Sequence, residues 1–373
     1  MKLSSVLTEL DAYPFLRLNQ ARSRLVEQGT EVIDFGVGEP REETPAFIRA
    51  ALVAGVTPRS GYPLAEGLPE YREAVADWIG RRFGRRVDPT TQVVPTLGSK
   101  EAIFHLAQVV AGDVVAITTP GYPVPARGAR FAGRELLELP LTAEHGFLPD
   151  LAAVPAEMWD RVAILWLNYP NNPTAATAPR ELYEHAAELA RRHDFVLASD
   201  EAYSELYFGD HAPGSALELD DLTNVAVFNT LSKRSSMPGF RCGFVAGDPD
   251  LVGALRRYRP NVGVAPQEFV QRAGIAAWHD ELHVDAVRDV YREKRTVLLA
   301  PLEAAGFRVA GGDATFFLWL KAPDGHVDRL LEQGIVLAPG AIFGPEVHDH
   351  ARLALVPTLE QCRRAAEAIG ALA

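Results

Sequence analysis

One lysine is a candidate nucleophile because lysine is rare in this chain. Lysine and arginine together number 37, and the only lysines are Lys2, Lys100, Lys233, Lys294 and Lys321. Lys233 follows the apolar run NVAVFNTLS at 224–232. Ligands of α/β sheets bind beyond the carboxyl ends of strands, and an amine held there partly out of water can attack an aldehyde. Taken alone, however, Lys233 is better explained as a loop lysine in an ion pair.

Two further polar residues end or follow apolar runs. Asp200 ends the run at 195–200, and a carboxylate at the end of a buried strand is costly unless a cation accompanies it. A protonated pyridine nitrogen would be such a cation. Asn172 lies in the proline-rich turn NYPNNPT at 168–174, where a fixed amide could donate to a phenolate oxygen. The alternatives are that Asp200 caps a turn and that Asn172 only forms one.

Other residues suit a phosphate, a carboxylate or a flat ring. The segment TLGSK at 96–100 joins an apolar run to a helix, and a helix start binds phosphate well, although Ser99 could be an ordinary N-cap. The guanidinium groups of Arg241 and Arg352 suit phosphate and carboxylate, although a surface ion pair explains either one alone. Tyr122, in TTPGYP, could stack on a ring or close a turn. Each residue lies at a strand-to-loop boundary, and together they meet the needs of one cofactor, a phosphorylated pyridine aldehyde.

The elements that must position these residues alternate along the middle of the chain. Helical patterns cover Lys100–Val110 and Arg180–His193. Short apolar runs typical of buried strands cover 114–120, 161–168, 195–201, 224–232 and 242–248. Near-continuous apolar strands that alternate with helices predict an α/β sheet covered on both faces.

The two ends of the chain predict a second, smaller domain. A long helical pattern at Glu281–Ala305 leads into strands at 315–321, 335–337 and 351–356, a helix at 327–333 and a final helix from Leu359. The first residues, to about Gly38, have no core of their own and are expected to pack on this α+β unit. We therefore predict a small domain of residues 1–40 and 285–373, and a large domain of residues 41–284.

Composition limits the class of protein. The chain has 373 residues, 47% of them apolar and 23% charged, which is typical of a globular protein of two domains. The net charge of −12 and the lack of a basic cluster argue against nucleic-acid binding, and the arginines at 81–82 and 85–86 are interpreted as a solvated helix end. The sequence contains no apolar run of about 18 residues, so no membrane span is predicted. No signal peptide is recognised at its start. Two distant cysteines predict neither a disulfide nor a metal site, so a cytoplasmic protein is expected.

Taken together, the motifs resemble those of the class I/II aminotransferases with the aspartate aminotransferase fold, fold type I. The resemblance covers nearly the whole chain. It rests on GVGEP (36–40), GYPLAEG (61–67), TLGSK (96–100), PGYP (120–123), NNPT (171–174), SDEAY (199–203) and SKRSSMPGFRCGF (232–244). It implies a large domain with a mostly parallel seven-stranded sheet between helices, a smaller α+β domain from both termini, the cofactor pyridoxal 5'-phosphate, and a homodimer with shared active sites.

The resemblance also implies roles around the cofactor ring. Lys233 would hold the cofactor as a Schiff base and then move the substrate proton. Asp200 would pair with the pyridine nitrogen, and Tyr122 would stack on the ring. Asn172 and Tyr203 would hydrogen-bond the ring hydroxyl.

A second group of residues would hold the charged ends of the cofactor and the substrate. The phosphate would be bound by Ser99, Lys100, Thr230, Ser232, Arg241 and, from the neighbouring subunit, Tyr62. Arg352 would bind the substrate α-carboxylate, and Gly38 would line the substrate pocket. One departure stands out, because Ala175 occupies a turn position where the family usually has glycine, so the turn must accept a Cβ or bend differently.

Within the family, three segments resemble N-succinyl-L,L-diaminopimelate aminotransferases of bacterial lysine biosynthesis, which use glutamate as amino donor. These segments are YPFLRL (13–18), LPLTAEHGFLPDL (139–151) and TLSKRSSMPGFRCGFVAGD (230–248). Lys100, Arg17 and Arg234 are the cationic candidates for the distal carboxylate of such a substrate.

Other functions remain open on the same fold. The chain could be another amino-acid aminotransferase, aspartate-like or of broad specificity, or a C–S β-lyase. Decarboxylation is disfavoured, because Arg352 would retain the α-carboxylate. The aminotransferase-like domain of a transcription regulator would bring an added DNA-binding domain, which the acidic charge and the early start of the resemblance disfavour.

Overall fold

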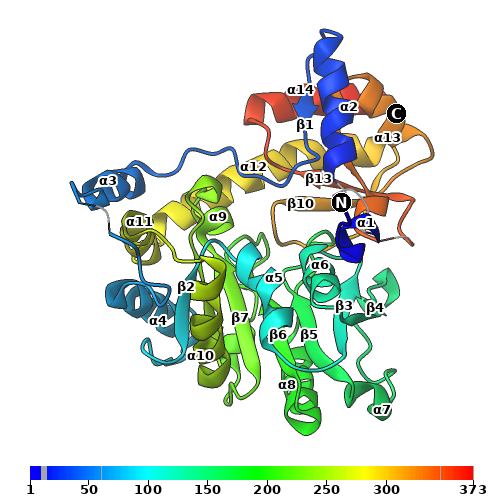
Figure 1. Cartoon of the computed structure of the whole chain (residues 1–373). Helices are drawn as coiled ribbons and strands as arrows, with labels where there is room; N and C mark the ends of the chain where they lie inside the picture. Colours follow the sequence, from blue (N-terminus) through cyan, green and yellow to red (C-terminus); the bar gives the residue numbers. More distant parts are fainter. Residues whose placement is uncertain (10–14, 60, 345, 373) are drawn as a thin grey trace.

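A seven-stranded sheet forms the centre of the larger lobe (Figure 1). The structure is a computed structural model that describes residues 1–9, 15–59, 61–344 and 346–372. The strands lie in the order β2-β8-β7-β6-β5-β3-β4, and all neighbours are parallel except β8, which is antiparallel to both β2 and β7. Their bounds are β2 Val93–Thr96, β3 Val114–Thr119, β4 Glu135–Pro140, β5 Val162–Asn168, β6 Val196–Asp200, β7 Val225–Thr230 and β8 Gly243–Gly247. The predicted mostly parallel, seven-stranded sheet is therefore confirmed.

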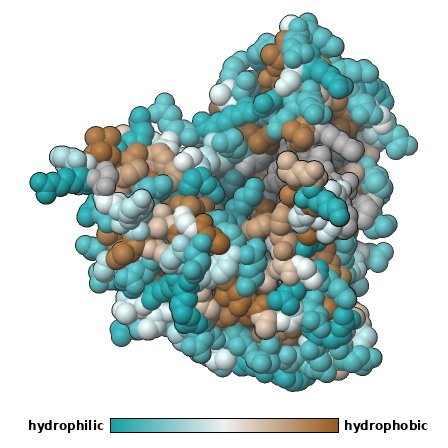
Figure 2. Space-filling view, viewed as in Figure 1, coloured by the Kyte–Doolittle hydropathy of each residue, from teal (hydrophilic) through white to brown (hydrophobic). Residues whose placement is uncertain are grey.

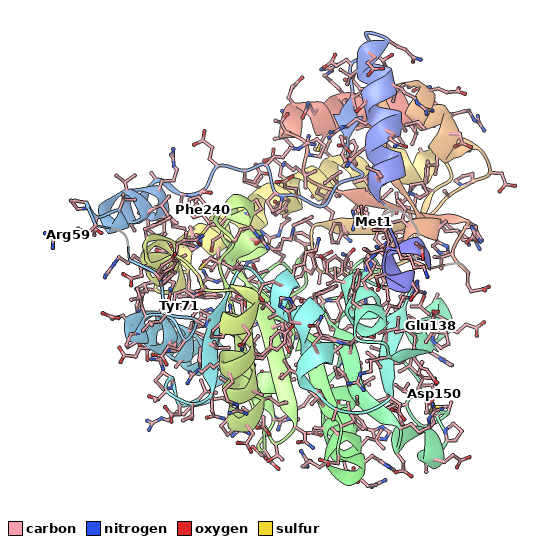
Figure 3. All side chains as sticks on the ribbon, in the orientation of Figure 1. Met1, Arg59, Tyr71, Glu138, Asp150 and Phe240 are labelled. Carbon is pink, nitrogen blue, oxygen red and sulfur yellow. The ribbon has the colours of Figure 1, made fainter. Side chains whose placement is uncertain are left out.

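Successive side chains of the sheet enter two different cores. Val227 packs in the core on one face, whereas the next residue, Phe228, packs in the core on the other. The first face is covered by α4 (Pro69–Phe83), α8 (Arg180–His193) and α11 (Glu268–Trp278), and the second by α5 (Lys100–Val109), α6 (Val124–Phe131) and α10 (Pro249–Tyr258). Tyr71, on α4, lies inside this lobe close to α11 (Figure 3). Because both faces are buried, the strands read as continuous apolar runs.

The smaller lobe joins both ends of the chain. Its main sheet is antiparallel, with β9 (Arg308–Val309), β10 (Phe317–Lys321), β12 (Ala338–Pro339) and β13 (His350–Ala354), and β1 (Ile33–Asp34) pairs with β11 (Ile335–Val336). The lobe also contains α2 (Phe15–Glu27), α13 (His326–Glu332) and α14 (Leu359–Gly370), and α12 (Leu282–Ala304) enters it from the large lobe (Figure 1). The prediction that the N-terminal segment packs on the C-terminal unit is confirmed. We propose the domain division at 1–40 with 285–373, and 41–284, on this basis.

Two sequence interpretations need correction. The strand expected at 224–232 ends at Thr230, because the Thr230 hydroxyl accepts a hydrogen bond from the Ser232 amide at 3.1 Å and starts a short helix, α9 (Leu231–Arg234). Arg81 and Arg82, in the last turn of α4, are not only a solvated helix end. Arg81 donates to the Trp278 carbonyl at 2.7 Å, and Arg82 donates to Glu205 at 3.0 Å, so they tie separate elements together.

An arm projects from the large lobe. It consists of α3 (Ala46–Gly55) and the residues after it, with Arg59 near its outer tip (Figure 3). Apolar side chains, drawn brown, gather on this arm (Figure 2), and Val53, Val56 and Tyr62 are among its exposed large residues. Exposed apolar surface of this kind commonly marks a contact with another protein. The two remaining helices are α1 (Ser5–Glu9) and α7 (Ala156–Trp159).

Among the described helices, none combines the length and the apolar character that crossing a membrane requires.

Candidate active site

A cavity of about 530 Å³ opens where the carboxyl ends of β5, β6 and β7 face the smaller lobe. Residues from both lobes line it. The lining includes every residue, except Tyr62, that was predicted to hold the cofactor, bind the α-carboxylate or line the substrate pocket: Gly38, Ser99, Lys100, Tyr122, Asn172, Asp200, Tyr203, Thr230, Ser232, Lys233, Arg241 and Arg352. The topology thus brings residues more than 300 positions apart in sequence, such as Gly38 and Arg352, to one site.

Lys233 presents a reactive amine to this cavity. It lies on α9, directly after β7, and its Nζ donates to the carbonyl of Gly38 at 2.7 Å. Burial, together with the positive charges of Arg352 and Arg241, lowers the pKa of Lys233 to about 7, although Glu39 and Asp200 oppose the shift. An amine with this pKa is partly neutral near neutral pH and can act as a nucleophile or a base.

Asp200 places a buried carboxyl group in the same cavity. It is the last residue of β6, pairs in register with Asn168 of β5, and is 4% exposed. Burial raises the pKa of Asp200 to about 7, while a hydrogen bond from the Ala202 amide and the charge of Lys233 act in the opposite direction. A cation bound beside this group would relieve the cost of its burial.

Arg352 is fixed for carboxylate binding. The residue is 2% exposed. Its guanidinium lies 4.2 Å from the ring centre of Phe317 and donates to Asn172 Oδ1 and to the Gly36 carbonyl, both at 2.8 Å. Because the Asn172 amide oxygen accepts from Arg352, its amide nitrogen is the group that can donate elsewhere. Gly38 lies so close that a Cβ there would stand 2.9 Å from the Phe317 ring, so a side chain at this position would displace that ring.

The start of α5 and Arg241 form a cradle for an anion. Arg241 donates to the Leu97 carbonyl at 3.0 Å and to the Ser232 hydroxyl at 3.3 Å. Gly98 has a φ of +65°, and a Cβ there would come within 2.4 Å of the Arg241 guanidinium. The Ser99 side chain makes no capping hydrogen bond, so the alternative of an ordinary N-cap is not supported. These donors fit a phosphate, and the buried Asp200 fits a protonated ring nitrogen.

The turn at Ala175 accepts a Cβ. Ala175 is fully buried with a φ of +59°, so the chain keeps the left-handed turn without glycine.

Several cavity residues were not predicted from the sequence: Asn19, Val37, Glu39, Asn168, Ala202, Pro238 and Phe317. Asn168 carried a usable signal, because it is a polar residue at the end of an apolar run, as Asp200 is. The Asn168 side chain donates to the Asp200 carbonyl at 2.9 Å and accepts from the backbone amide of Asn172 at 3.0 Å. It thereby connects two site residues.

Arg234 was wrongly assigned to the substrate. Its side chain is 1% exposed, is absent from the cavity lining, and donates to Glu281 at 2.7 Å and to the Ala277 carbonyl at 2.8 Å. The side chain of Arg17 lies outside the described part of the chain. Tyr62 is fully exposed on the arm and does not line the cavity of its own chain.

This sheet and this cavity together define an enzyme of the fold-type-I class, which works on amino groups with pyridoxal phosphate. The chain belongs to the family described as aminotransferase class I and II, whose model matches residues 30–369. Pyridoxal phosphate is the cofactor of this family. The protein is therefore an aminotransferase.

Named relatives include several kinds of aminotransferase. The chain is 40% identical to an LL-diaminopimelate aminotransferase of Aquifex aeolicus over 380 residues, which covers 99% of this chain and 98% of that one. A solved structure named as a probable N-succinyldiaminopimelate aminotransferase from Thermus thermophilus is 30% identical, with a TM-score of 0.89 and coverage of 96% and 100%. A mutant aspartate aminotransferase from the same organism is 28% identical, with a TM-score of 0.91 and full coverage of both chains. The named relatives thus include diaminopimelate, N-succinyldiaminopimelate and aspartate aminotransferases.

Proposed function

We propose that this aminotransferase moves an amino group between the glutamate/2-oxoglutarate pair and a diaminopimelate, with Lys233 as the group that carries the proton. One observation supports this assignment most directly. The Lys233 amine, with a pKa of about 7, shares one cavity with the buried Asp200 and the fixed Arg352. The names of the relatives point to the same substrate class.

Each part of the cofactor has a matching group in the cavity. Lys233 would bind it covalently, Asp200 would pair with its ring nitrogen, and Tyr122 would cover a ring face. Asn172 and Tyr203 would donate to its ring oxygen. Its phosphate would be held by Ser99 and Lys100 at the start of α5, and by Thr230, Ser232 and Arg241. When bound, pyridoxal phosphate supplies an electron sink for the bond pair left at the substrate α-carbon.

The chain's own groups then orient the substrate and move its proton. Arg352 would hold the α-carboxylate in a two-bond grip, because its guanidinium is already fixed by Asn172 and Gly36. Lys233 would accept the proton from the α-carbon and return it at the neighbouring position. An amine with a pKa of about 7 can both accept and release a proton near neutral pH, which suits a residue with both tasks.

Within the diaminopimelates, we favour free LL-diaminopimelate. Its distal end carries an ammonium and a carboxylate. The cavity wall offers the Glu39 carboxylate and, because Lys100 would hold the phosphate through its backbone amide, also the Lys100 side chain. In N-succinyl-LL-diaminopimelate, the distal ammonium is replaced by an amide and a further carboxylate, which leaves Glu39 without a cationic partner. The succinylated compound is the second candidate, supported by the Thermus structure and by the sequence motifs.

Glutamate formation from 2-oxoglutarate tests this choice, with LL-diaminopimelate, N-succinyl-LL-diaminopimelate and aspartate as alternative donors. We expect the highest kcat/KM for LL-diaminopimelate. A higher value for the succinylated compound would replace our choice with the second candidate, and a higher value for aspartate would refute both. Release of ammonia and pyruvate from cystathionine at a comparable rate would instead favour the C–S β-lyase.

Glu39→Gln should weaken recognition of the distal ammonium. Loss of one charge-assisted hydrogen bond, about 1.5 kcal/mol, predicts a fall of about tenfold in kcat/KM for LL-diaminopimelate. The rate constant for transfer of the amino group from glutamate to the cofactor should change much less. Glu43→Gln is the matched control, because the Glu43 side chain is 89% exposed and carries the same charge in the same segment. Equal losses for both substrates would exclude Glu39 as a distal contact.

We also propose a cytoplasmic homodimer in which Tyr62 of one subunit contacts the phosphate of the other. The fully exposed Tyr62 and the apolar arm support such a contact, and the free, buried Cys242 and Cys362 suit a reducing compartment. Analytical ultracentrifugation should give a mass of twice the chain mass of 40.7 kDa. A monomer under assay conditions would contradict the proposal.

A further inference from the structure

The residue after Lys233 fastens the lysine-bearing turn to the junction between α11 and α12. The Arg234 guanidinium lies 5.1 Å from the Trp278 ring centre and donates to the carbonyls of Ala277 and Asp280 at 2.8 and 3.1 Å. It also pairs with Glu281 at 2.7 Å. The turn that carries Lys233 is therefore tied to the helix that continues into the smaller lobe.

The next residue makes a second, titratable link to the same junction. Ser235 Oγ lies 2.8 Å from His283 Nε2, and His283 Nδ1 lies 2.6 Å from Asp280 Oδ1. The same Asp280 oxygen accepts from the His283 backbone amide at 2.9 Å. Because a carboxylate only accepts, Nδ1 carries the proton, and Nε2 of the neutral ring accepts from the Ser235 hydroxyl.

This Ser–His–Asp order does not make a hydrolytic site. Ser235 is 0% exposed and does not line the cavity, so no substrate reaches its hydroxyl. Its oxygen also accepts a hydrogen bond from Arg234 Nη1 at 3.3 Å. The three residues therefore act on the chain itself.

We propose that Ser235, His283 and Asp280 form a positioning network for Lys233, in which neutral His283 accepts a hydrogen bond from Ser235. The inference rests on the role of Lys233 proposed above. Ser235 ends α9, where its amide donates to the Leu231 carbonyl at 3.1 Å. Thr44 donates to the Ser236 carbonyl at 2.5 Å, so the segment that also carries Gly38, the partner of the Lys233 amine, is held by the same turn. Loss of the network would shift the amine relative to Gly38 and the cavity.

Charges around His283 favour its neutral form. Burial first, and then the positive charge of Arg234, lower the pKa of His283, whereas Asp280 raises it. Glu281 pairs with Arg234, and the Phe47 ring of α3 has its centre 5.5 Å from that of the His283 ring. Because the pKa of folded His283 lies below its ordinary value of about 6.5, the neutral form predominates at and above that pH, and protonation at lower pH reverses the hydrogen bond with Ser235.

The test measures the Lys233 amine directly in cofactor-free protein. Competitive acetylation, with peptide mapping by mass spectrometry, gives the amine pKa and its reactivity as a function of pH. In His283→Ala we expect the Lys233 pKa to rise by about one unit or more, because the relaxed turn exposes the amine to water. His283→Gln keeps an acceptor for Ser235, so the amine pKa should stay near that of the wild type.

His279→Gln is the matched control, since His279 is an exposed histidine of the same junction, bound to the Ile275 carbonyl at 3.0 Å. Ser235→Ala provides a second disruption if His283→Ala does not fold. An unchanged Lys233 pKa in the folded variants, with only a lower melting temperature, would overturn the proposal. Because acetylation needs neither cofactor nor substrate, the result does not depend on which substrate the enzyme uses.

Discussion

Replacing Lys233 by alanine is expected to lower kcat by at least about 10³-fold with every amino donor. The variant loses the covalent hold on the cofactor and the only assigned proton carrier, and general acid–base catalysis alone contributes about 10² to 10⁴-fold. Steady-state turnover of LL-diaminopimelate with 2-oxoglutarate measures the loss. The neighbouring Arg352 and Arg241 cannot replace it, because a guanidinium offers only donors and does not act as a base.

Lys321→Ala is the matched control for this change. Lys321 is half-exposed and pairs with Asp349 at 3.0 Å on the smaller lobe, so its loss should leave kcat within a factor of about two. If the Lys233→Ala protein is folded and retains more than a few per cent of the wild-type turnover, Lys233 is not the proton carrier.

The second large effect is expected for Asp200→Asn, which should lower turnover by about 10² to 10³-fold. A neutral amide cannot keep the ring nitrogen of the cofactor protonated, so the electron sink weakens. The loss should lie in kcat rather than in substrate KM, because Arg352 still binds the carboxylate. A variant with wild-type kcat would contradict the assignment of Asp200.

The same substitution should have the opposite effect on the stability of the cofactor-free protein. Burial raises the pKa of Asp200 to about 7 from an ordinary value of about 3.9. Below about pH 4 the carboxyl is protonated in both the folded and the unfolded protein, so its burial as a charge costs no stability. Between about pH 4 and pH 7 it ionises in the unfolded protein first, and the free energy of unfolding falls. The Asp200→Asn variant should melt at a higher temperature than the wild type at about pH 8 and at a similar one at about pH 4. Greater destabilisation at the higher pH would contradict the burial argument.

The site was largely predictable because its residues stand where local patterns change. Asp200, Asn172 and Lys233 each end or follow an apolar run, and the carboxyl ends of parallel strands meet at one edge of the sheet. β4 was missed, because ELLELP is mostly a half-exposed edge strand whose charges hide the apolar run. The ends of the chain could be joined because the N-terminal segment has no core of its own.

Features set by side-chain direction and distant contacts were not predictable. Arg234 was assigned to the substrate because it follows Lys233, yet adjacent residues of a helical turn point in different directions, and Arg234 stacks on Trp278, from a distant helix. The contact between Ser235 and His283 joins residues 48 positions apart in the sequence, and no local sequence pattern predicts it. Glu39 was part of a recognised motif, but only the fold places it in the cavity.

Lys233 is the residue on which the proposed chemistry depends, because it would hold the cofactor. The most direct test is borohydride reduction of the holoenzyme, followed by digestion and mass spectrometry of the peptides. We predict a phosphopyridoxyl group on the peptide that contains Lys233, and on no other. The same group on Lys2, Lys100, Lys294 or Lys321, with Lys233 unmodified, would contradict this assignment.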